Sequence, residues 1–147
     1  MAAIADAQQR FSASWESFFR TTRRLRGRAG RFPGELTLPQ YHLLEALRDT
    51  ADLPVGELAD RAGVAPPTAT RMLDCLARDG IVERRHSETD RRSVLVRLTA
   101  DGEEAVEKAH GVIEAWRRQV FEALDPEERE PAARLLARLS QIMEQQL

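Results

Sequence analysis

Arginine side chains crowd one short stretch of this sequence. Arg84, Arg85, Arg91, Arg92 and Arg97 all lie there. A guanidinium group is planar and permanently charged, so it binds phosphate through two hydrogen bonds and also fits a narrow minor groove. The stretch therefore predicts contact with a nucleic acid. The alternative is that these charges only keep an exposed β-hairpin soluble.

Similar chemistry lies just upstream, on a helix predicted from Pro66 to about Gly80. Proline fits the first turn of a helix, and glycine often ends one. Four apolar residues at helical spacing predict its buried stripe, namely Ala69, Met72, Leu73 and Leu76. The other faces carry the side chains suited to base edges and phosphates in a major groove, namely Thr68, Thr70, Arg71 and Arg78.

The elements that position these side chains are a helix, a turn and a hairpin. Leu58, Ala59 and Ala62 recur at helical spacing, and Gly63 follows them where the chain needs a positive φ. Strands are predicted near residues 81–86 and 94–98, because the second segment alternates apolar and polar residues. A helix-turn-helix alone is weak support for DNA binding, since two antiparallel helices with a solvated charged face have the same pattern. The Arg-rich β-hairpin that follows strengthens the prediction of DNA binding.

The hairpin also carries a family signature. Residues 90–99, DRRSVLVRLT, resemble the pattern D-x-R-x-x-x-(V/L)-x-L-T of the MarR family of bacterial transcription regulators. Residues 58–85 resemble that family's recognition region, and the resemblance covers nearly the whole chain. It implies a mainly α fold with a small β-hairpin wing, a winged helix-turn-helix joined to a helical dimerisation region. It also implies a homodimeric, sequence-specific DNA-binding regulator, usually a repressor released from a pseudo-palindromic operator by a small ligand or by oxidation.

The resemblance assigns the wing to the minor groove. Arg92 is its first candidate there and Arg91 its second, with Asp90 as the brace that fixes the arginine. The predicted DNA-binding set is Thr68, Thr70, Arg71, Arg78, Arg84, Arg85, Asp90, Arg91 and Arg92. One departure concerns the start of the recognition helix, where relatives often carry serines and this chain has Ala65 and Pro67. Ala65 supplies no cap and Pro67 has no N–H, so Thr68, Thr70 and Arg71 must supply more of the contact.

Long amphipathic helices flank this region. Residues 6–30, 99–124 and a final helix from Asp125–Pro126 carry apolar stripes, with Thr99 as a cap and a kink or restart expected at Pro131. One small core does not need three such helices. The predicted organisation is a dimerisation helix in 1–35, the winged helix-turn-helix in 36–99 and dimerisation helices in 100–147, all in one intertwined domain. A capping box at Thr37–Gln40 and a short strand near Leu53 are also expected.

Charge is unevenly distributed along the chain. The net charge is −2, yet residues 61–97 carry eight Arg against five acidic residues. Residues 98–147 carry six basic against eleven acidic residues. A local positive surface on an acidic chain suits a DNA-facing region. A basic run at residues 20–31 has three open uses: a solvated helix end, phosphate contact, or the edge of a ligand cleft.

Several function classes are not expected. His42, His86 and His110 have no metal-binding spacing, and the sequence has no phosphate loop or nucleophile elbow, so neither an enzyme, a metal site nor a cofactor is predicted. No apolar run reaches membrane-spanning length and the N-terminus lacks a secretory pattern. A single cysteine excludes an internal disulfide. A cytoplasmic protein is therefore expected, without a membrane partner.

Two questions stay open. Cys75 is interpreted as a small, partly buried residue, with a thiol-based redox sensor as the alternative because Arg71 and Arg78 lie within one turn. A winged-helix module that binds proteins instead of DNA is a further alternative.

The resemblance also implies an effector cleft for a small aromatic or phenolic molecule, although aromatic residues at helical spacing are more often core. The candidate contacts are Trp15, Phe19, Tyr41, His42 and Trp116.

Overall fold

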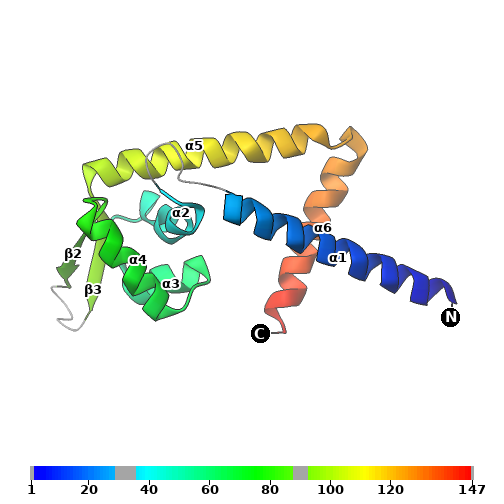
Figure 1. The fold of residues 1–147 in the computed structure, drawn as a ribbon, viewed down its shortest axis with the longest axis horizontal. Helices are drawn as coiled ribbons and strands as arrows, with labels where there is room; N and C mark the ends of the chain where they lie inside the picture. The colour runs from blue at the N-terminus through cyan, green and yellow to red at the C-terminus, as the bar shows by residue number, and fades with distance from the viewer. Residues whose placement is uncertain (1, 29–35, 88–92, 147) are drawn as a thin grey trace. The chain divides into compact units, whose positions relative to one another are not determined.

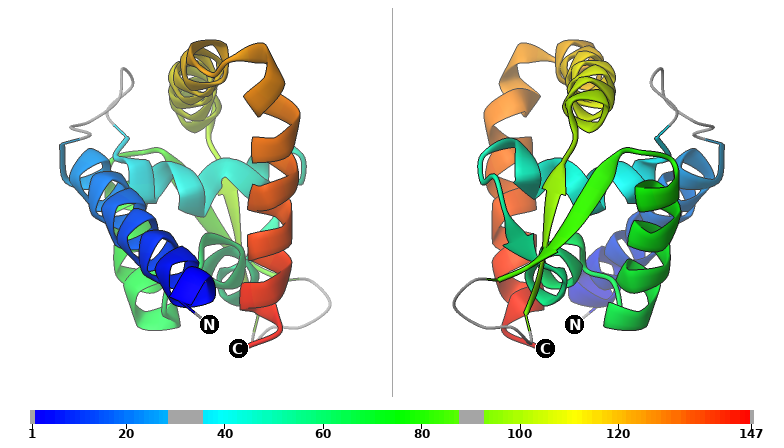
Figure 2. Two further views of the ribbon diagram at one scale, coloured as in Figure 1. Left: turned by 90° about the vertical axis from the view of Figure 1, so that its right-hand side faces the viewer. Right: turned by 90° about the vertical axis from the view of Figure 1, so that its left-hand side faces the viewer.

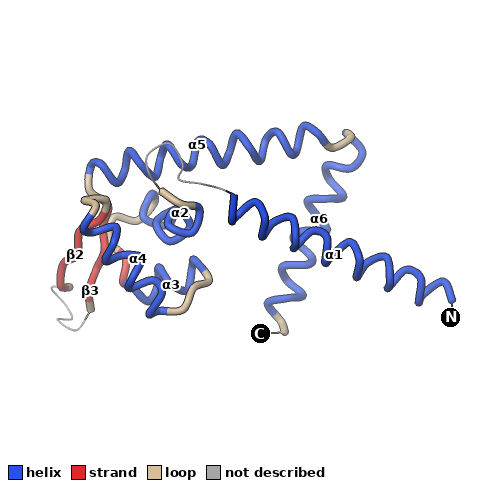
Figure 3. Tube along the Cα trace, in the orientation of Figure 1, coloured by secondary structure: helices blue, strands red, loops and turns tan. Residues whose placement is uncertain are grey.

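Helices make up most of the chain, and one small sheet completes the fold (Figure 3). The computed structural model describes residues 2–28, 36–87 and 93–146. The chain divides into two compact units, Met1–His110 and Gly111–Leu147, and one long helix runs through the boundary. The mainly α fold with a β-hairpin wing is therefore confirmed.

The elements follow one another in the order that the sequence predicts (Figure 1). In chain order they are α1 Ala2–Arg28, α2 Leu38–Leu44, the 3₁₀ helix η1 Glu45–Arg48, β1 Leu53–Pro54, α3 Val55–Ala62, α4 Pro66–Arg78, β2 Val82–His86, β3 Val94–Leu98, α5 Ala100–Ala123 and α6 Pro126–Glu144. Strands β2 and β3 form the wing. The helix expected to reach Arg48 does so only as a 3₁₀ turn after Leu44.

The three strands pair antiparallel in the order β1-β3-β2. Leu53 lies opposite Val96, and Val82 lies opposite Leu98, so the predicted strand near Leu53 pairs with the wing. Helix α4 contacts both α3 and β2, and lies beside the hairpin in Figure 2. The core of this region is built of fully buried leucines from three helices, Leu43, Leu44, Leu58 and Leu73.

Local signals set the element boundaries. At the start of α2, the Gln40 N–H donates to the Thr37 hydroxyl at 3.4 Å and the Thr37 N–H donates to the Gln40 side chain at 2.8 Å, which is the predicted capping box. Gly63 and Gly80 follow α3 and α4 with φ of +64° and +73°, where a residue with a side chain would be strained. Each glycine ends its helix and turns the chain toward the next element.

The start of α5 is fixed against the wing. The Thr99 hydroxyl accepts from the Gly102 N–H at 3.0 Å, as a helix cap does, and lies 2.5 Å from the Gly80 carbonyl oxygen. A Cβ at Gly102 would lie 2.0 Å from the Ile81 carbonyl oxygen, so only glycine fits there. The expected Thr99 cap is confirmed, and Gly102 allows α5 to pack directly on the backbone that enters β2.

The second unit contains the end of α5 and all of α6. Helix α6 begins after Asp125, whose N–H donates to the Glu128 carboxylate at 3.0 Å. The helix continues through Pro131, so the restart considered for this position is wrong. Pro131 is only the sixth residue of α6, and its missing N–H costs a single hydrogen bond near the helix start. None of the α6 residues is buried.

Candidate nucleic-acid interface

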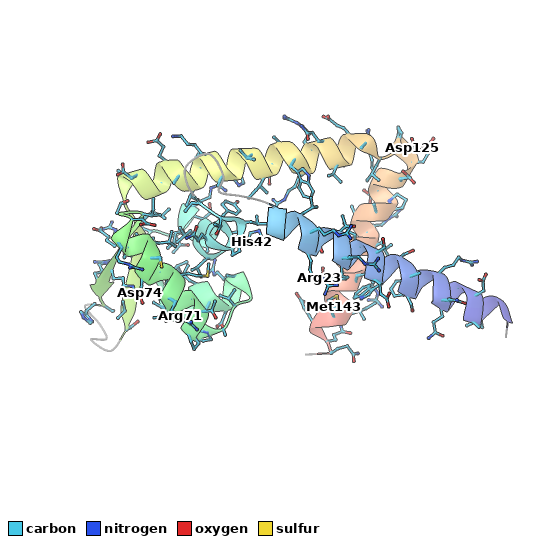
Figure 4. All side chains as sticks on the ribbon, viewed as in Figure 1. Arg23, His42, Arg71, Asp74, Asp125 and Met143 are labelled. Atoms are coloured by element: carbon cyan, nitrogen blue, oxygen red, sulfur yellow. The ribbon has the colours of Figure 1, made fainter. Side chains whose placement is uncertain are left out.

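The outward face of α4 presents the side chains predicted to contact bases. Thr68, Thr70 and Arg71 are all exposed, and Arg71 is labelled in Figure 4. The Thr70 hydroxyl donates to the Pro66 carbonyl at 3.0 Å, which orients it along the helix. Within the described part of the chain, the Arg71 guanidinium has no hydrogen-bond or ion-pair partner. Its five donors are therefore available to a ligand such as a guanine edge.

The start of α4 lacks a side-chain cap. Ala65 is the N-cap residue with extended backbone, and Pro66 is the first helical residue. The structure thus agrees with the departure from the family pattern that the sequence indicates at Ala65. The predicted start at Pro66 is also confirmed, because proline at this position sacrifices no helical hydrogen bond.

Arg84 reaches from the wing to α4. Its Nη1 donates to Asp74 Oδ1 at 2.6 Å and its Nη2 donates to the Thr70 carbonyl oxygen at 3.2 Å. The Arg84 side chain is 30% exposed and the Asp74 side chain 50%. Arg84 and Thr70 also line a groove of about 390 Å³ where α3, α4 and the wing meet. Arg84 is therefore held against the helix on one side and open to solvent on the other.

The base of the wing carries a second set of ion pairs. Asp52, just before β1, accepts from Arg85 Nε at 3.1 Å and from Arg85 Nη2 at 2.8 Å. Arg97 on β3 lies 3.9 Å from Asp52 and 3.5 Å from Glu83. Exposed pairs of this kind stabilise a fold by about 0–1 kcal/mol each. Their main effect here is to orient two wing arginines along the sheet and to balance their charge.

Cys75 is exposed, so the interpretation as a partly buried residue is wrong. Position 75 follows the buried Leu73 by two residues, and at about 100° per residue it turns away from the core. Arg78, a predicted DNA contact, is also exposed and its Nη2 donates to the Cys75 sulfur at 3.1 Å. The two side chains therefore share one patch at the C-terminal end of α4.

Three predicted contacts, Asp90, Arg91 and Arg92, lie outside the described residues. Two residues that pair with wing arginines were not predicted from the sequence as their partners, namely Asp52 and Asp74. Asp52 could have been found from the strand register, because one step beyond the Leu53–Val96 pair it faces Arg97. The pairing of Asp74 with Arg84 depends on how α4 crosses the hairpin, which has no signal in the sequence.

The predicted effector residues fall into three groups. Trp15 and Phe19 pack together on α1 with ring centroids 4.7 Å apart. Tyr41 and His42 are neighbours on α2, with centroids 5.7 Å apart. Trp116 belongs to the second unit and is 49% exposed.

Tyr41 is part of the core of the first unit. It is 1% exposed, and its hydroxyl lies 2.8 Å from His110 Nδ1. Arg48 Nη1 lies 3.2 Å from the same nitrogen, while other nitrogens of Arg48 donate to Glu107. Because a guanidinium can only donate, His110 Nδ1 is an acceptor and the Tyr41 hydroxyl donates to it. This network ties α2 and η1 to the first half of α5.

Neither metal binding nor a membrane span has support in the described ranges. Across residues 2–28, 36–87 and 93–146, no group of three or more His, Cys, Asp or Glu side chains could hold a metal ion. Within the same ranges, no helix combines the length and the apolar character needed to cross a bilayer.

Comparisons with known proteins agree with this geometry. The model of the MarR family matches residues 36–94. The HTH-type transcriptional regulator YfiV of Bacillus subtilis is 32% identical over 110 residues, which cover 75% of this chain and 69% of that protein. A mutant of E. coli MarR complexed with operator DNA is similar with a TM-score of 0.72 and 26% identity, covering 84% of this chain and 91% of that one.

A further solved structure is that of BpsR from Bordetella bronchiseptica, whose DNA binding is regulated by 6-hydroxynicotinic acid. It matches with a TM-score of 0.72 and 26% identity over 87% of this chain and 98% of that one. The winged helix-turn-helix fold, the exposed face of α4 and these relatives lead to one conclusion. The chain belongs to the MarR family and is a DNA-binding transcription regulator, not an enzyme.

Proposed function

We propose that this chain is a homodimeric repressor that binds a pseudo-palindromic operator and is released from it by a small aromatic molecule. The observation that carries the proposal is the free Arg71 guanidinium on the exposed face of α4. In this proposal α4 enters the major groove, where Arg71 binds a guanine edge and Thr68 and Thr70 meet bases or phosphates. Arg78 and Arg85 contact the flanking backbone.

The wing has a separate role in the proposal. Arg92, or else Arg91, reaches the adjacent minor groove, and Asp90 holds it in place. The expected result of Arg92→Ala is weaker operator binding by an intact dimer, by about 1–3 kcal/mol if the arginine reads the groove. Sedimentation of the free protein checks the dimer. Unchanged affinity at physiological salt would contradict the wing assignment.

Dimerisation is proposed from large apolar side chains that stay exposed in the described part of the chain. Phe11 and Phe18 on α1 are 53% and 56% exposed. On α6, Leu135 and Leu136 are each 57% exposed. Exposed apolar stripes on long helices are typical of subunit interfaces. We therefore expect residues 1–35 and 100–147 to dimerise while 36–99 binds DNA, in the cytoplasm if the host is a bacterium.

The DNA-binding step is tested by selecting a duplex from a random library with the wild-type protein. Affinity for the selected duplex is then compared with that for a scrambled duplex at several salt concentrations, because nonspecific binding is dominated by salt-sensitive phosphate contacts. Arg71→Ala should weaken binding to the selected duplex by about 1–3 kcal/mol and relax specificity. Arg118→Ala, which removes the same charge from an exposed position on α5, is the control. Equal losses in both variants, or no selected sequence, would contradict the proposal.

The effector step has its own test. The similar protein BpsR is regulated by an aromatic acid, and the candidate residues Trp15, Phe19, Tyr41, His42 and Trp116 include both tryptophans of the chain. The variants Trp15→Phe and Trp116→Phe therefore each leave a single fluorescent reporter. Titration with 6-hydroxynicotinate, as a probe of the class, should change the fluorescence of at least one variant and reduce duplex binding. A flat titration together with unchanged DNA binding would exclude this aromatic acid as an effector.

A further inference from the structure

Arg84 stands on the wing, yet its guanidinium binds the recognition helix. We propose that Arg84 and Asp74 form a clamp that fixes α4 relative to the wing, and that Arg84 acts on operator recognition through this clamp. In this role Arg84 is a positioning residue and does not itself bind DNA. The inference rests on the proposed function, since it concerns how α4 is presented to an operator.

The clamp holds α4 through its backbone and through a side chain. Arg84 donates to the Asp74 carboxylate at 2.6 Å and to the Thr70 carbonyl at 3.2 Å. Thr70 and Asp74 are four residues apart, and in an α-helix the carbonyl oxygen of one residue points toward the N–H of the residue four positions later, so both acceptors lie at the same level of α4. A single bond would leave α4 able to pivot about it. Two bonds from one rigid, planar group hold this point of the helix against the wing in a defined orientation.

The clamp lies next to the residue proposed to bind a base. Thr70 directly precedes Arg71, so Arg84 holds the backbone from which the free guanidinium projects. A binding group must be held within about 0.5 Å of its productive position by its supporting residues. Arg71 has no partner of its own among the described side chains, so the position of its backbone determines where it reaches.

The charges of the pair also favour a positioning role. Asp74 balances the charge of Arg84, so the pair together adds little to the attraction for phosphate. If Arg84 instead bound a phosphate directly, Asp74 would only repel the DNA. The two roles therefore predict opposite signs for the loss of Asp74. Neutralising it should tighten DNA binding if Arg84 binds phosphate, and weaken specific binding if the clamp operates.

The decisive variant is Asp74→Asn, with Asp79→Asn as the matched control. Asp79 caps the same helix and is exposed, and its carboxylate has no partner among the described residues. Affinity is measured by fluorescence anisotropy for the selected duplex and for the scrambled one, and melting temperature checks the fold. Asp74→Asn should weaken binding to the selected duplex by about three- to thirtyfold, which lies within the coupling measured between neighbouring residues, and leave scrambled binding nearly unchanged. Asp79→Asn should not weaken either.

A double-mutant cycle completes the test. Asp74→Ala and Arg84→Ala should each weaken specific binding, and the pair Asp74→Ala/Arg84→Ala should lose no more than the worse single variant. The double variant keeps the net charge, so the salt dependence of its scrambled binding should match the wild type. The inference is overturned if Asp74→Asn binds the selected duplex as tightly as wild type, or if Arg84→Ala lowers the salt slope by about one, as loss of a phosphate contact would. If the wild type selects no sequence, the proposed function fails and the clamp fails with it.

Discussion

The winged region and helix α6 both carry apolar stripes at helical spacing, but only the stripes of the winged region are buried within the chain. In the winged region, Leu58 on α3 and Leu73 on α4 are completely buried within the chain. On α6, Leu135 and Leu136 remain more than half exposed, and no residue of that helix is buried. A stripe at helical spacing therefore predicts an apolar partner, but not whether that partner lies in the same chain.

This difference in burial distinguishes a part of the chain that forms its own core from a helix whose apolar face is left exposed. The winged region closes its own core with three helices and a sheet, so it can hold α4 and the wing rigidly. Helix α6 should be only marginally stable by itself, because most of the stability of a helix in a protein comes from packing its apolar face. A second copy of the chain would supply that packing. Substitutions in the two kinds of stripe should therefore have different effects, on the dimer in α6 and on the fold in the winged region.

The largest effect is expected from charges placed on the α6 stripe. Leu135→Glu with Ile142→Glu puts two carboxylates on one face, seven residues apart, at positions 57% and 41% exposed. Burying each side chain contributes about 1.5–3 kcal/mol, so the dimer should dissociate and binding to the selected duplex should fall by more than about 100-fold. Sedimentation velocity measures the dimer. The control, Ala137→Glu with Gln141→Glu, adds the same charges at exposed positions on the face opposite the stripe and should leave the dimer intact.

The next effect concerns the joint between the wing and α5. Gly102→Ala forces a Cβ against the Ile81 carbonyl oxygen and should lower the free energy of unfolding by about 1–3 kcal/mol, as overpacking does. Gly111→Ala on the same helix meets nothing within 4 Å and should instead raise it by about 0.5–1 kcal/mol. Chemical denaturation measures both. Equal effects would show that Gly102 is not a special position.

A smaller effect is expected within the core of the winged region. Tyr41→Phe removes the hydroxyl that donates to His110 and should lower the free energy of unfolding by about 1 kcal/mol. Affinity of the folded protein for DNA should stay unchanged, because Tyr41 is buried and its hydroxyl bonds His110 on α5. Urea titration and anisotropy measure the two quantities. A loss of DNA affinity with unchanged stability would contradict a purely structural role for this hydroxyl.

Local signals explain why much of the fold was predictable. Pro66, Gly63, Gly80 and Thr99 each mark an element boundary through their own backbone or side chain, and the structure has the boundaries there. The alternation of residues 94–98 likewise predicts a strand of the wing, which pairs as expected. Helical geometry indicates an exposed Cys75, as the structure has it, whereas the residue type favours burial because cysteine is usually buried.

Long-range pairs explain what was not predictable. Arg84 is one of several arginines in the sequence, and nothing near it indicates that it binds Asp74 and the Thr70 carbonyl. Asp52 and Arg85 are 33 positions apart and meet only because β1 joins the sheet. At Pro131 the sequence predicts too much, because a residue that usually breaks helices suggests a restart, yet α6 continues through it near the start of the helix. The roles of Asp90, Arg91 and Arg92 remain predictions from the sequence.

In the proposed complex, two copies of the chain present two α4 helices to one operator. The stoichiometry of the complex and its hydroxyl-radical protection pattern on the selected duplex test this arrangement. We expect two chains per duplex and two protected half-sites whose centres lie about one helical turn apart, near 34–36 Å. One chain per duplex, or protection of a single half-site, would contradict it.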